Sequence, residues 1–325
     1  WTRDTYTIDY ELVGGTVDGN PAEYSVETES FAPNNPTKNG YTFAGWDKTV
    51  VRCQGNATYT ATYTRREKAS AFVNSGKCGA NLTWTLTEDG TLTISGTGAM
   101  SDYRSDGTAP WYDYRESVKS VVIENGAASI GNYAFYQCTS LTSVVIADSV
   151  TKVGQWAFYG CDNLTSITIP GSVTSIGDAA FSDCTRLAGL TIPGSVTGIG
   201  NSAFAGCVNL TDVQIPDSVT TIGESAFSDC TKLTNVVLSD SVTSIRGFTF
   251  YGCDSLTSIT IPDSVTSIGN YAFRDCTSLT SVTIGDSVTG IGDEAFSDCY
   301  SLTDVYYAGT QSQWKAITIG SYNSS

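Results

Sequence analysis

The stretch AFYGCDNLTSITIPGSVTSIGDA at residues 157–179 decides the fold, because the pattern restarts with another Ala-Phe pair 23 residues later. Phenylalanine, cysteine and leucine recur at this interval over most of the chain. The three rows are Phe135, Phe158, Phe181, Phe204, Phe227, Phe250, Phe273 and Phe296; Cys138, Cys161, Cys184, Cys207, Cys230, Cys253, Cys276 and Cys299; and Leu141, Leu164, Leu187, Leu210, Leu233, Leu256, Leu279 and Leu302. Such rows predict a stack of similar coils, each burying its apolar side chains against its neighbours.

Each coil contains two short extended runs. The Leu-x-x-Ile-x-Ile run alternates like a half-buried strand, and the Val-x-x-Ile-Gly run is a second extended piece. The Ala-Phe-x-x-Cys run, which precedes the first extended run of each coil, predicts one helical or 3₁₀ turn. A period of roughly 20–29 residues with leucine in phase is typical of leucine-rich repeats. We therefore predict a mainly β fold, a leucine-rich-repeat solenoid of 23-residue coils preceded by a small β module.

Glycine and proline punctuate the coils. Proline cannot donate to a β-ladder, so it should end the first strand at Pro170, Pro193, Pro216 and Pro262. Glycine after the second run predicts a turn residue with positive φ. These glycines are Gly131, Gly154, Gly177, Gly200, Gly223, Gly269 and Gly292. One coil departs from the repeat pattern, because Arg246 replaces the glycine and Thr249 replaces the alanine. We expect this coil to be locally distorted.

The flanking segments differ in composition from the repeats. Residues 82–86 and 91–94 alternate around a turn-forming Glu-Asp-Gly and predict a hairpin. A solenoid needs end pieces that shield its terminal coils from water. The expected domains are a β module at 1–66, an N-terminal cap with the first solenoid strands at 67–128, the repeats at 129–307 and a C-terminal cap at 308–325.

Composition excludes several classes of function. The formal net charge is −16, and residues 67–325 account for most of it with 25 acids against 11 bases. Such a surface repels phosphate backbones and anionic membranes, so we expect no nucleic-acid partner. Histidine is absent, which excludes catalytic centres built on histidine and zinc sites with histidine ligands. No run of about 18 apolar residues occurs, so we expect no membrane insertion.

The first part of the chain resembles the Listeria–Bacteroides type repeat, also known as the internalin B-repeat. The matching residues are Tyr10 to Thr16, Asn35 to Thr37, Gly40 to Trp46 and Tyr59 to Ala61. The resemblance implies a β-grasp-like module that serves as a spacer or stalk in a surface protein. Core packing or sugar stacking could each explain its aromatic residues Tyr41, Phe43 and Trp46.

The repeats resemble the BspA-like, or Treponema pallidum type, leucine-rich repeats. The unit length, the Ala-Phe-x-x-Cys string and the Ile-Pro-x-Ser-Val-Thr-x-Ile-Gly string all match, as in residues 157–177. The resemblance implies a secreted or surface-attached bacterial protein that is often linked to adhesion. Expected localisation is therefore extracellular or at the cell surface.

The cysteine row invites three chemical interpretations: disulfides, a metal site or buried thiols. No Cys-x-x-Cys pair occurs, and cysteine is often buried as a small apolar group, so we predict free buried thiols without a metal. A bridge between Cys53 and Cys78 is a separate possibility. Asp148, Asp217, Asp240, Asp263 and Asp286 form an acidic column. Capping of local turns explains it more simply than calcium.

Two repeat positions beside the buried Ala-Phe pair carry aromatic residues in some coils and small or charged residues in others. We propose these aromatic side chains as ligand-binding candidates, because variation at exposed positions of a regular scaffold is where recognition can reside. They are Tyr133, Trp156, Phe248 and Tyr271 at one position, and Tyr136, Tyr159 and Tyr251 three residues later. Partial burial without any ligand is the alternative.

These features predict an extracellular, non-enzymatic binding or adhesion protein. Its ligand would be a host protein, a glycan or another cell surface, and it would have no cofactor, metal or catalytic residue. The alternative is a passive spacer or stalk in a larger surface protein. Carboxylates are abundant, yet no pair stands in an apolar setting that would raise one pKa for acid–base catalysis.

Overall fold

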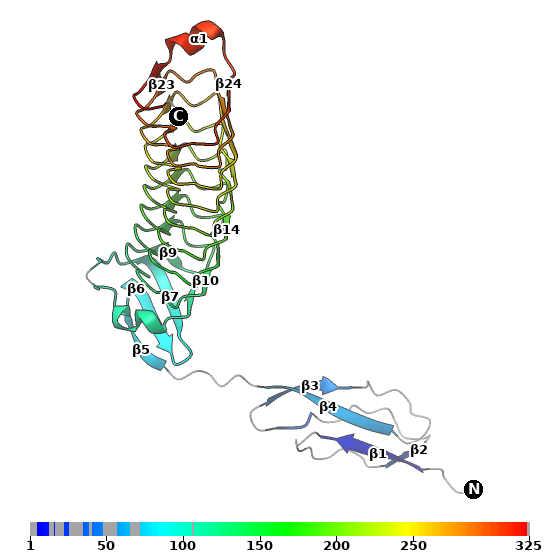
Figure 1. Cartoon of the computed structure of the whole chain (residues 1–325). Helices are drawn as coiled ribbons and strands as arrows, with labels where there is room; N and C mark the ends of the chain where they lie inside the picture. The colour runs from blue at the N-terminus through cyan, green and yellow to red at the C-terminus, as the bar shows by residue number, and fades with distance from the viewer. Residues whose placement is uncertain are drawn as a thin grey trace. The chain divides into compact units, whose positions relative to one another are not determined.

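The computed structural model describes residues 5–12, 16, 23–25, 35–38, 41–47, 57–65, 72–105 and 107–323. The chain forms two compact units, residues 1–70 and 71–325, and we describe each by itself (Figure 1).

A mixed β-sheet forms the described part of the first unit. Its strands are β1 (Thr5–Glu11), β2 (Glu23–Ser25), β3 (Tyr41–Trp46) and β4 (Ala57–Arg65). They are ordered β2-β1-β4-β3, with β1 and β4 parallel and the outer pairs antiparallel. The rings of Tyr10, Trp46 and Tyr59 pack with centroids 5.7–6.5 Å apart. This sheet is the small β module that the sequence predicts.

Two hairpins open the second unit. Strands β5 (Phe72–Lys77), β6 (Gly79–Thr87) and β7 (Thr91–Met100) pair antiparallel in chain order, as the sequence predicts for β6 and β7. Strand β7 also pairs in parallel with the first two solenoid strands, so the hairpins lead directly into the coils. Trp111, just before the 3₁₀ helix η1 (Tyr112–Ser117), stacks on Phe135 at 5.6 Å and covers the first coil.

The solenoid has two strand-bearing sides. The first side carries β8 (Ser120–Ile123), β10 (Ser143–Ile146), β12 (Ser166–Thr168), β14 (Gly189–Thr191), β16 (Asp212–Gln214), β18 (Asn235–Val237), β20 (Ser258–Ile261), β22 (Ser281–Ile284) and β24 (Asp304–Tyr307). The second carries β9 (Ala127–Ile130), β11 (Lys152–Val153), β13 (Ser175–Ile176), β15 (Gly198–Ile199), β17 (Thr221–Ile222), β19 (Ser244–Ile245), β21 (Ser267–Ile268), β23 (Gly290–Ile291) and β25 (Thr318–Ile319). Where neighbouring strands pair, they run parallel, which confirms the predicted mainly β leucine-rich-repeat solenoid.

The solenoid ends in a short helix. Helix α1 (Gln311–Ala316) follows β24, and Thr310 caps it through a reciprocal bond pattern with Gln313. The Trp314 ring of α1 lies 5.4 Å from that of Tyr307. This helix therefore covers part of the last coil.

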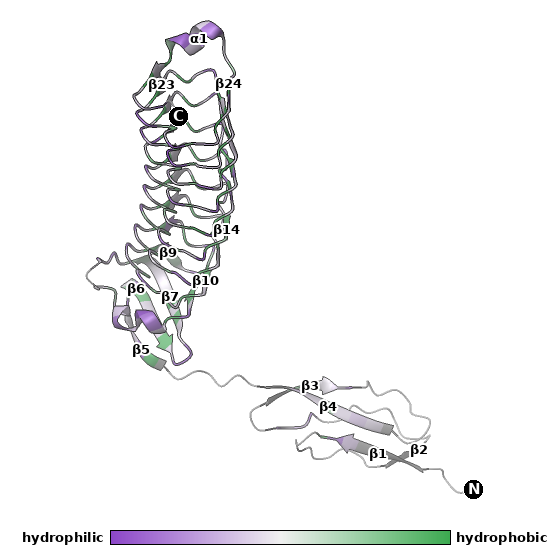
Figure 2. Ribbon diagram, in the orientation of Figure 1, coloured by the Kyte–Doolittle hydropathy of each residue, from purple (hydrophilic) through white to green (hydrophobic). Residues whose placement is uncertain are grey.

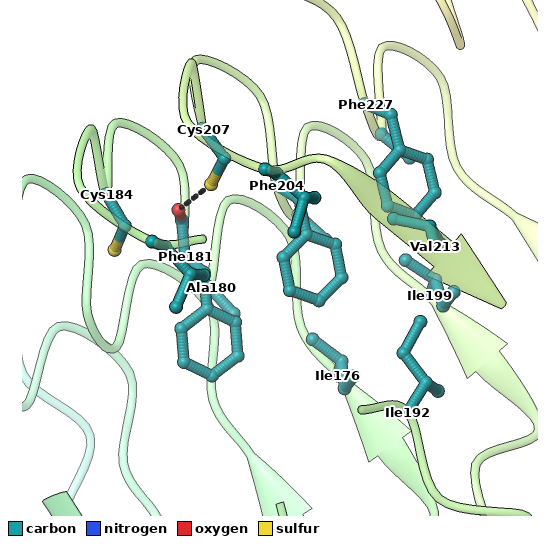
Figure 3. Close-up of a cluster of buried hydrophobic side chains, with 14 of the residues drawn as sticks. Ile176, Ala180, Phe181, Cys184, Ile192, Ile199, Phe204, Cys207, Val213 and Phe227 are labelled. Atoms are coloured by element: carbon teal, nitrogen blue, oxygen red, sulfur yellow. Dashed lines mark hydrogen bonds between the residues drawn. The ribbon is translucent and has the colours of Figure 1, made fainter. Parts of the chain in front are cut away.

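The repeated apolar rows form a continuous core, which Figure 2 shows as hydrophobic colour along the coils. Phe158 to Phe273 are completely buried and stack coil upon coil, with neighbouring centroids 5.2–5.7 Å apart. Phe296 of the last coil is only half-buried. Figure 3 shows Phe181, Phe204 and Phe227 in this row, with isoleucine and valine side chains beside them. Burial of this kind is the main favourable term in folding a solenoid.

The cysteines form a second buried row. From Cys161 to Cys299, each Sγ donates a hydrogen bond of 3.1–3.3 Å to a phenylalanine carbonyl oxygen of the preceding coil. Figure 3 shows the bond from Cys207 to Phe181. All described cysteines are free buried thiols, as predicted. Cys78 is one of them, while Cys53 lies outside the described residues, and with it the suggested bridge between the two.

The third side of each coil is formed by the Ala-Phe-x-x-Cys segment and the residues just before it, and it consists of turns. The predicted helical or 3₁₀ turn there is therefore wrong for the described coils. Alternate residues bond to different partners there. Trp156, Phe158 and Gly160 donate backbone N–H groups to the next coil at 2.8–2.9 Å. Tyr159 and Cys161 donate instead to the residue three positions earlier, at 3.3 and 3.2 Å. The third side therefore contributes its own ladder between coils.

The role predicted for the repeat glycines is also wrong. None of the seven has a positive φ in the structure. The reason for glycine is space, because a Cβ on Gly177 would lie 2.6 Å from the backbone nitrogen of Gln155 in the preceding coil. Positive φ occurs instead on the third side, at two residues per coil. The first is Tyr133 and its counterparts, with φ of 49–60°, and the second is Gln137 and its counterparts, with φ of 54–72°.

The coil with Arg246 and Thr249, which departs from the repeat pattern, interrupts the strand ladder of the second side. Strands β17 and β19 are not paired, whereas β19 pairs normally with β21. Arg246 stands at this break, where other coils have the close-packed glycine. The third side remains bonded, since Phe227 and Asp229 still donate to Thr249 and Tyr251. The predicted local distortion therefore interrupts the ladder of the second side at this coil, and β18 and β20 are also unpaired on the first side.

Candidate functional site

All seven candidate residues lie on the third side of the solenoid and are half-buried. The structure gathers them into two groups. The first aromatic patch consists of Tyr133, Tyr136, Trp156 and Tyr159, and the second aromatic patch consists of Phe248, Tyr251 and Tyr271. Three coils with only alanine or serine at these positions separate the two patches. Whether any of these residues binds a ligand stays a prediction.

The first aromatic patch is a two-by-two array of rings. Tyr133 stacks on Trp156 at 5.8 Å with 2° between the planes, and Tyr136 stacks on Tyr159 at 5.1 Å. The two columns touch, since the rings of Trp156 and Tyr159 lie 4.9 Å apart. The register of one coil on the next produces the stacking, because equivalent side chains stand directly above each other. Such an array offers a rigid amphipathic surface with phenol hydroxyls.

The second aromatic patch has one member that the sequence analysis missed. Phe248 stacks on Tyr271 at 4.6 Å, and Phe248 also lies 5.8 Å from Tyr251. The guanidinium of Arg274 stands over the Tyr271 ring at 5.7 Å. Arg274 occupies the repeat position of Tyr136, where the sequence analysis noted a charged residue but took only the aromatic ones as candidates.

The backbone beneath the aromatic residues is strained. Tyr133, Trp156, Phe248 and Tyr271 all have left-handed φ values of 55–60°. This region favours glycine and asparagine, and bulky residues adopt it at a cost of about 1–2 kcal/mol each. The other left-handed position of each coil follows the normal preference, with glycine or aspartate in every coil except the first, which has Gln137. Ala179, Ser202, Ser225 and Glu294 adopt the same conformation at this position, so the strain belongs to the repeat and the aromatic side chains are additions to it.

Carboxylates border the first aromatic patch. A hydrogen bond with Asp183, followed by burial and nearby charges, raises the pKa of Tyr159 to about 12. Burial raises the pKa of Asp162, and the neighbouring charge of Asp183 adds to this effect. The equivalent pair behaves alike in the second patch, where a hydrogen bond with Asp275 raises the pKa of Tyr251. These carboxylates therefore stand close to one another and to the phenol groups.

The other candidate chemistries find little support in the geometry. Burial raises the pKa of Cys138 and Cys230 to about 12, which disfavours the thiolate needed for redox or metal chemistry. Within the described ranges, no cluster of three or more cysteine, aspartate or glutamate side chains is arranged to hold a metal ion. In the acidic column, Asp263 accepts a bond from the backbone N–H of Asp286 in the next coil. That aspartate therefore joins two coils, where we predicted a cap on its own turn.

The described residues include no helix that is both long and apolar enough to cross a membrane.

Comparison with known families identifies both parts of the chain. Residues 111–233 and 197–319 match the BspA type leucine rich repeat region, with six copies, and together these matches span more than half of the chain. Residues 6–67 match the Listeria-Bacteroides repeat domain. The chain matches none of the curated proteins with which it was compared.

Several solved structures are similar to the chain. A leucine-rich repeat protein from Bacteroides ovatus ATCC 8483 is 24% identical, with a TM-score of 0.47, covering 75% of this chain and 78% of that one. The T. pallidum leucine rich repeat protein is 26% identical, with a TM-score of 0.40, covering 75% and 86%. A leucine-rich repeat protein from Eubacterium ventriosum ATCC 27560 is 25% identical, with a TM-score of 0.44, covering 73% and 85%. Because these TM-scores are low, family membership rests on the family match.

Proposed function

We propose that this chain, which belongs to the BspA-type leucine-rich repeat family, is an extracellular, non-enzymatic binding protein. Its ligand is a host protein, a glycan or another cell surface, and the first aromatic patch makes the contact. The repeat scaffold holds that patch in place, and the module at residues 1–66 acts as a spacer.

The strained aromatic residues carry this proposal. Tyr133 and Trp156 occupy left-handed backbone positions that Ser202 and Ser225 fill in other coils of the same solenoid. The fold therefore does not require aromatic side chains there. Since the scaffold adopts the same strained conformation with alanine or serine, the choice of a ring at Tyr133 and Trp156 points to a contact that the ring itself makes. Tyrosine and tryptophan are also the residue types that dominate binding surfaces.

Absence of histidine from the sequence and burial of the described thiols support a non-enzymatic role. Raised thiol pKa values work against nucleophilic catalysis, which needs the thiolate. The aromatic patches offer contact area but lack an activated nucleophile. Binding without chemistry is therefore the function that this geometry supports best.

A panel of glycans and matrix proteins, displayed as an array, tests the proposal with the full chain. The variant carrying both Trp156→Ala and Tyr159→Ala should lose retention on the spot that the natural chain recognises. Ser202→Ala is the matched control, since it changes the same repeat position in a coil without aromatic residues. Near-ultraviolet circular dichroism would check that both variants fold. Absence of any saturable ligand would favour the alternative, a passive spacer or stalk.

A further inference from the structure

The two ends of the solenoid differ in how well their core is covered. Trp111 stacks on Phe135 and buries the core of the first coil. In the last coil, positions that are buried one coil earlier are exposed. Val305 pairs with Val282, yet 49% of Val305 is exposed against 1% of Val282. The last coil therefore presents core side chains that no described coil covers.

The second side shows the same difference. Ile319 of β25 pairs with Ile291 of β23, and the exposed fractions are 48% and 6%. Phe296 and Leu302 of the last coil are half-buried, whereas the same rows are completely buried one coil earlier. Apolar side chains of the last coil are thus left partly open to solvent from both strand-bearing sides.

Helix α1 covers this end incompletely and leaves a cavity beneath it. Figure 1 shows α1 at the C-terminal end of the solenoid. The half-buried Trp314 of α1 lines a cavity of about 170 Å³ together with Phe296 and Leu302. Val282 of β22 and Ile291 of β23 also line it and are at most 6% exposed. The cavity therefore extends from under the helix to the buried core.

The lining is almost wholly apolar. Apart from the indole N–H of Trp314, Asn323 has the one polar side chain among the described lining residues. Its Nδ2 donates to the carbonyl oxygens of Gly292 and Gly320 at 2.8 and 2.9 Å, and its Oδ1 accepts from the backbone N–H of Phe296 at 3.1 Å. A polar ligand would lose its bonds to water here without replacing them, so an uncharged apolar ligand fits better.

The volume suits a single small ring. A cavity of about 150 Å³ lined by leucine, isoleucine and phenylalanine stays dry and binds benzene. The cavity under α1 has a similar volume and lining, and its Phe296 and Trp314 rings can pack edge-to-face against another ring. Because Val305 and Ile319 at its border are about half exposed, a ligand can enter without opening a coil.

We propose that the cavity under α1 binds a small uncharged apolar molecule, the size of one aromatic ring. The molecule lies between Trp314 and the buried side chains of Val282 and Ile291, where it gains dispersion contacts and leaves water. Its binding joins α1 to the last coil. This site is separate from the two aromatic patches and does not depend on the proposed binding function.

Isothermal titration calorimetry of the full chain with benzene tests the site. We expect one molecule to bind with a dissociation constant on the order of 1 mM, a normal strength for six carbon atoms. Benzene should also raise the midpoint of thermal unfolding, because it binds only the folded chain. Phenol is the matched probe, with the same ring and a hydroxyl group that finds no partner. It should bind at least about tenfold more weakly.

Val305→Phe should weaken benzene binding by about tenfold or more, because the added ring occupies the space of the ligand. Val145→Phe is the matched control, with the same change at an exposed valine of β10, near the other end of the solenoid. It should leave the affinity unchanged. Trp314→Ala removes one wall of the cavity and should also weaken binding. Near-ultraviolet circular dichroism would check that each variant stays folded.

Equal benzene binding by Val305→Phe and the natural chain would overturn the inference, since the ring would then bind elsewhere, for example at the first aromatic patch. Lack of saturable benzene binding, or phenol binding as tightly as benzene, would also overturn it. Sedimentation velocity provides the remaining test. A monomer that binds benzene agrees with the proposal, whereas a dimer that excludes benzene would assign the open end to a second copy of the chain.

Discussion

Replacing Phe204 with alanine should cost the solenoid about 4 kcal/mol of unfolding free energy, within the range for buried aromatic truncations. Phe204 is completely buried and lies 5.4 Å from both Phe181 and Phe227. Neither neighbour can move into the vacated space easily, because backbone bonds of 2.8 Å to the next coil hold Phe181 and Phe204 in place. A cavity that cannot collapse places the cost in the upper part of the range.

Phe296→Ala in the last coil is the internal comparison. Phe296 is half-buried and stacks on a single partner, Phe273, at 5.3 Å. Its loss should therefore cost roughly half as much, about 2 kcal/mol. Urea titration of the full chain, followed by circular dichroism, gives the two midpoints under one set of conditions. A loss below about 1 kcal/mol for Phe204→Ala would refute the claim that the phenylalanine row forms the core.

Three further changes test separate parts of the structure. Gly177→Ala should lower the unfolding free energy by about 1–3 kcal/mol through overpacking, because the added Cβ would lie 2.6 Å from the backbone of the preceding coil. Gly171→Ala, which has open space around it, should be nearly neutral when the two variants are compared by thermal unfolding. Ser239→Pro restores the proline of other coils and should raise stability by about 0.5–1 kcal/mol; a loss would show that the Ser239 bond to Val219 matters more. The pKa of Tyr159, raised to about 12, means that its stabilising effect is complete below the normal value near 10 and is lost as the pH rises through 12. Asp183→Asn should lower the midpoint of its ultraviolet titration, and an unchanged midpoint would contradict the hydrogen bond.

The solenoid and its apolar core could be predicted from the sequence because their signal is repeated. Phe204, Cys207 and Leu210 each return in neighbouring coils, so one set of side chains fixes the register of the stack. Cysteine could be assigned as a buried thiol on the same grounds. The 23-residue period does not determine the backbone conformation of a single residue. It therefore could not show that the repeat glycines serve close packing and that residues such as Trp156 adopt the left-handed conformation.

The candidate site was predictable in part. Variation at the positions of Tyr133 and Tyr136 marked the third side as the place to look. Grouping into two patches follows directly from the one-coil register, which stacks equivalent side chains. Arg274 was missed because it is the only base at an otherwise aromatic or small position, and its meaning depends on carboxylates from the next coil. The contacts of Arg274 with Glu294 and Asp298 of the next coil are visible only in the structure, because sequence spacing does not reveal side-chain contacts.

Hydroxyl-radical footprinting of the aromatic side chains, with and without the ligand retained on the array, tests the central claim most directly. If the first aromatic patch is the binding surface, Trp156 and Tyr159 should become protected, while Tyr300, which is 75% exposed on the last coil, should react as before. Protection confined to the first side, for example at Tyr306 of β24, with Trp156 unchanged, would contradict the account.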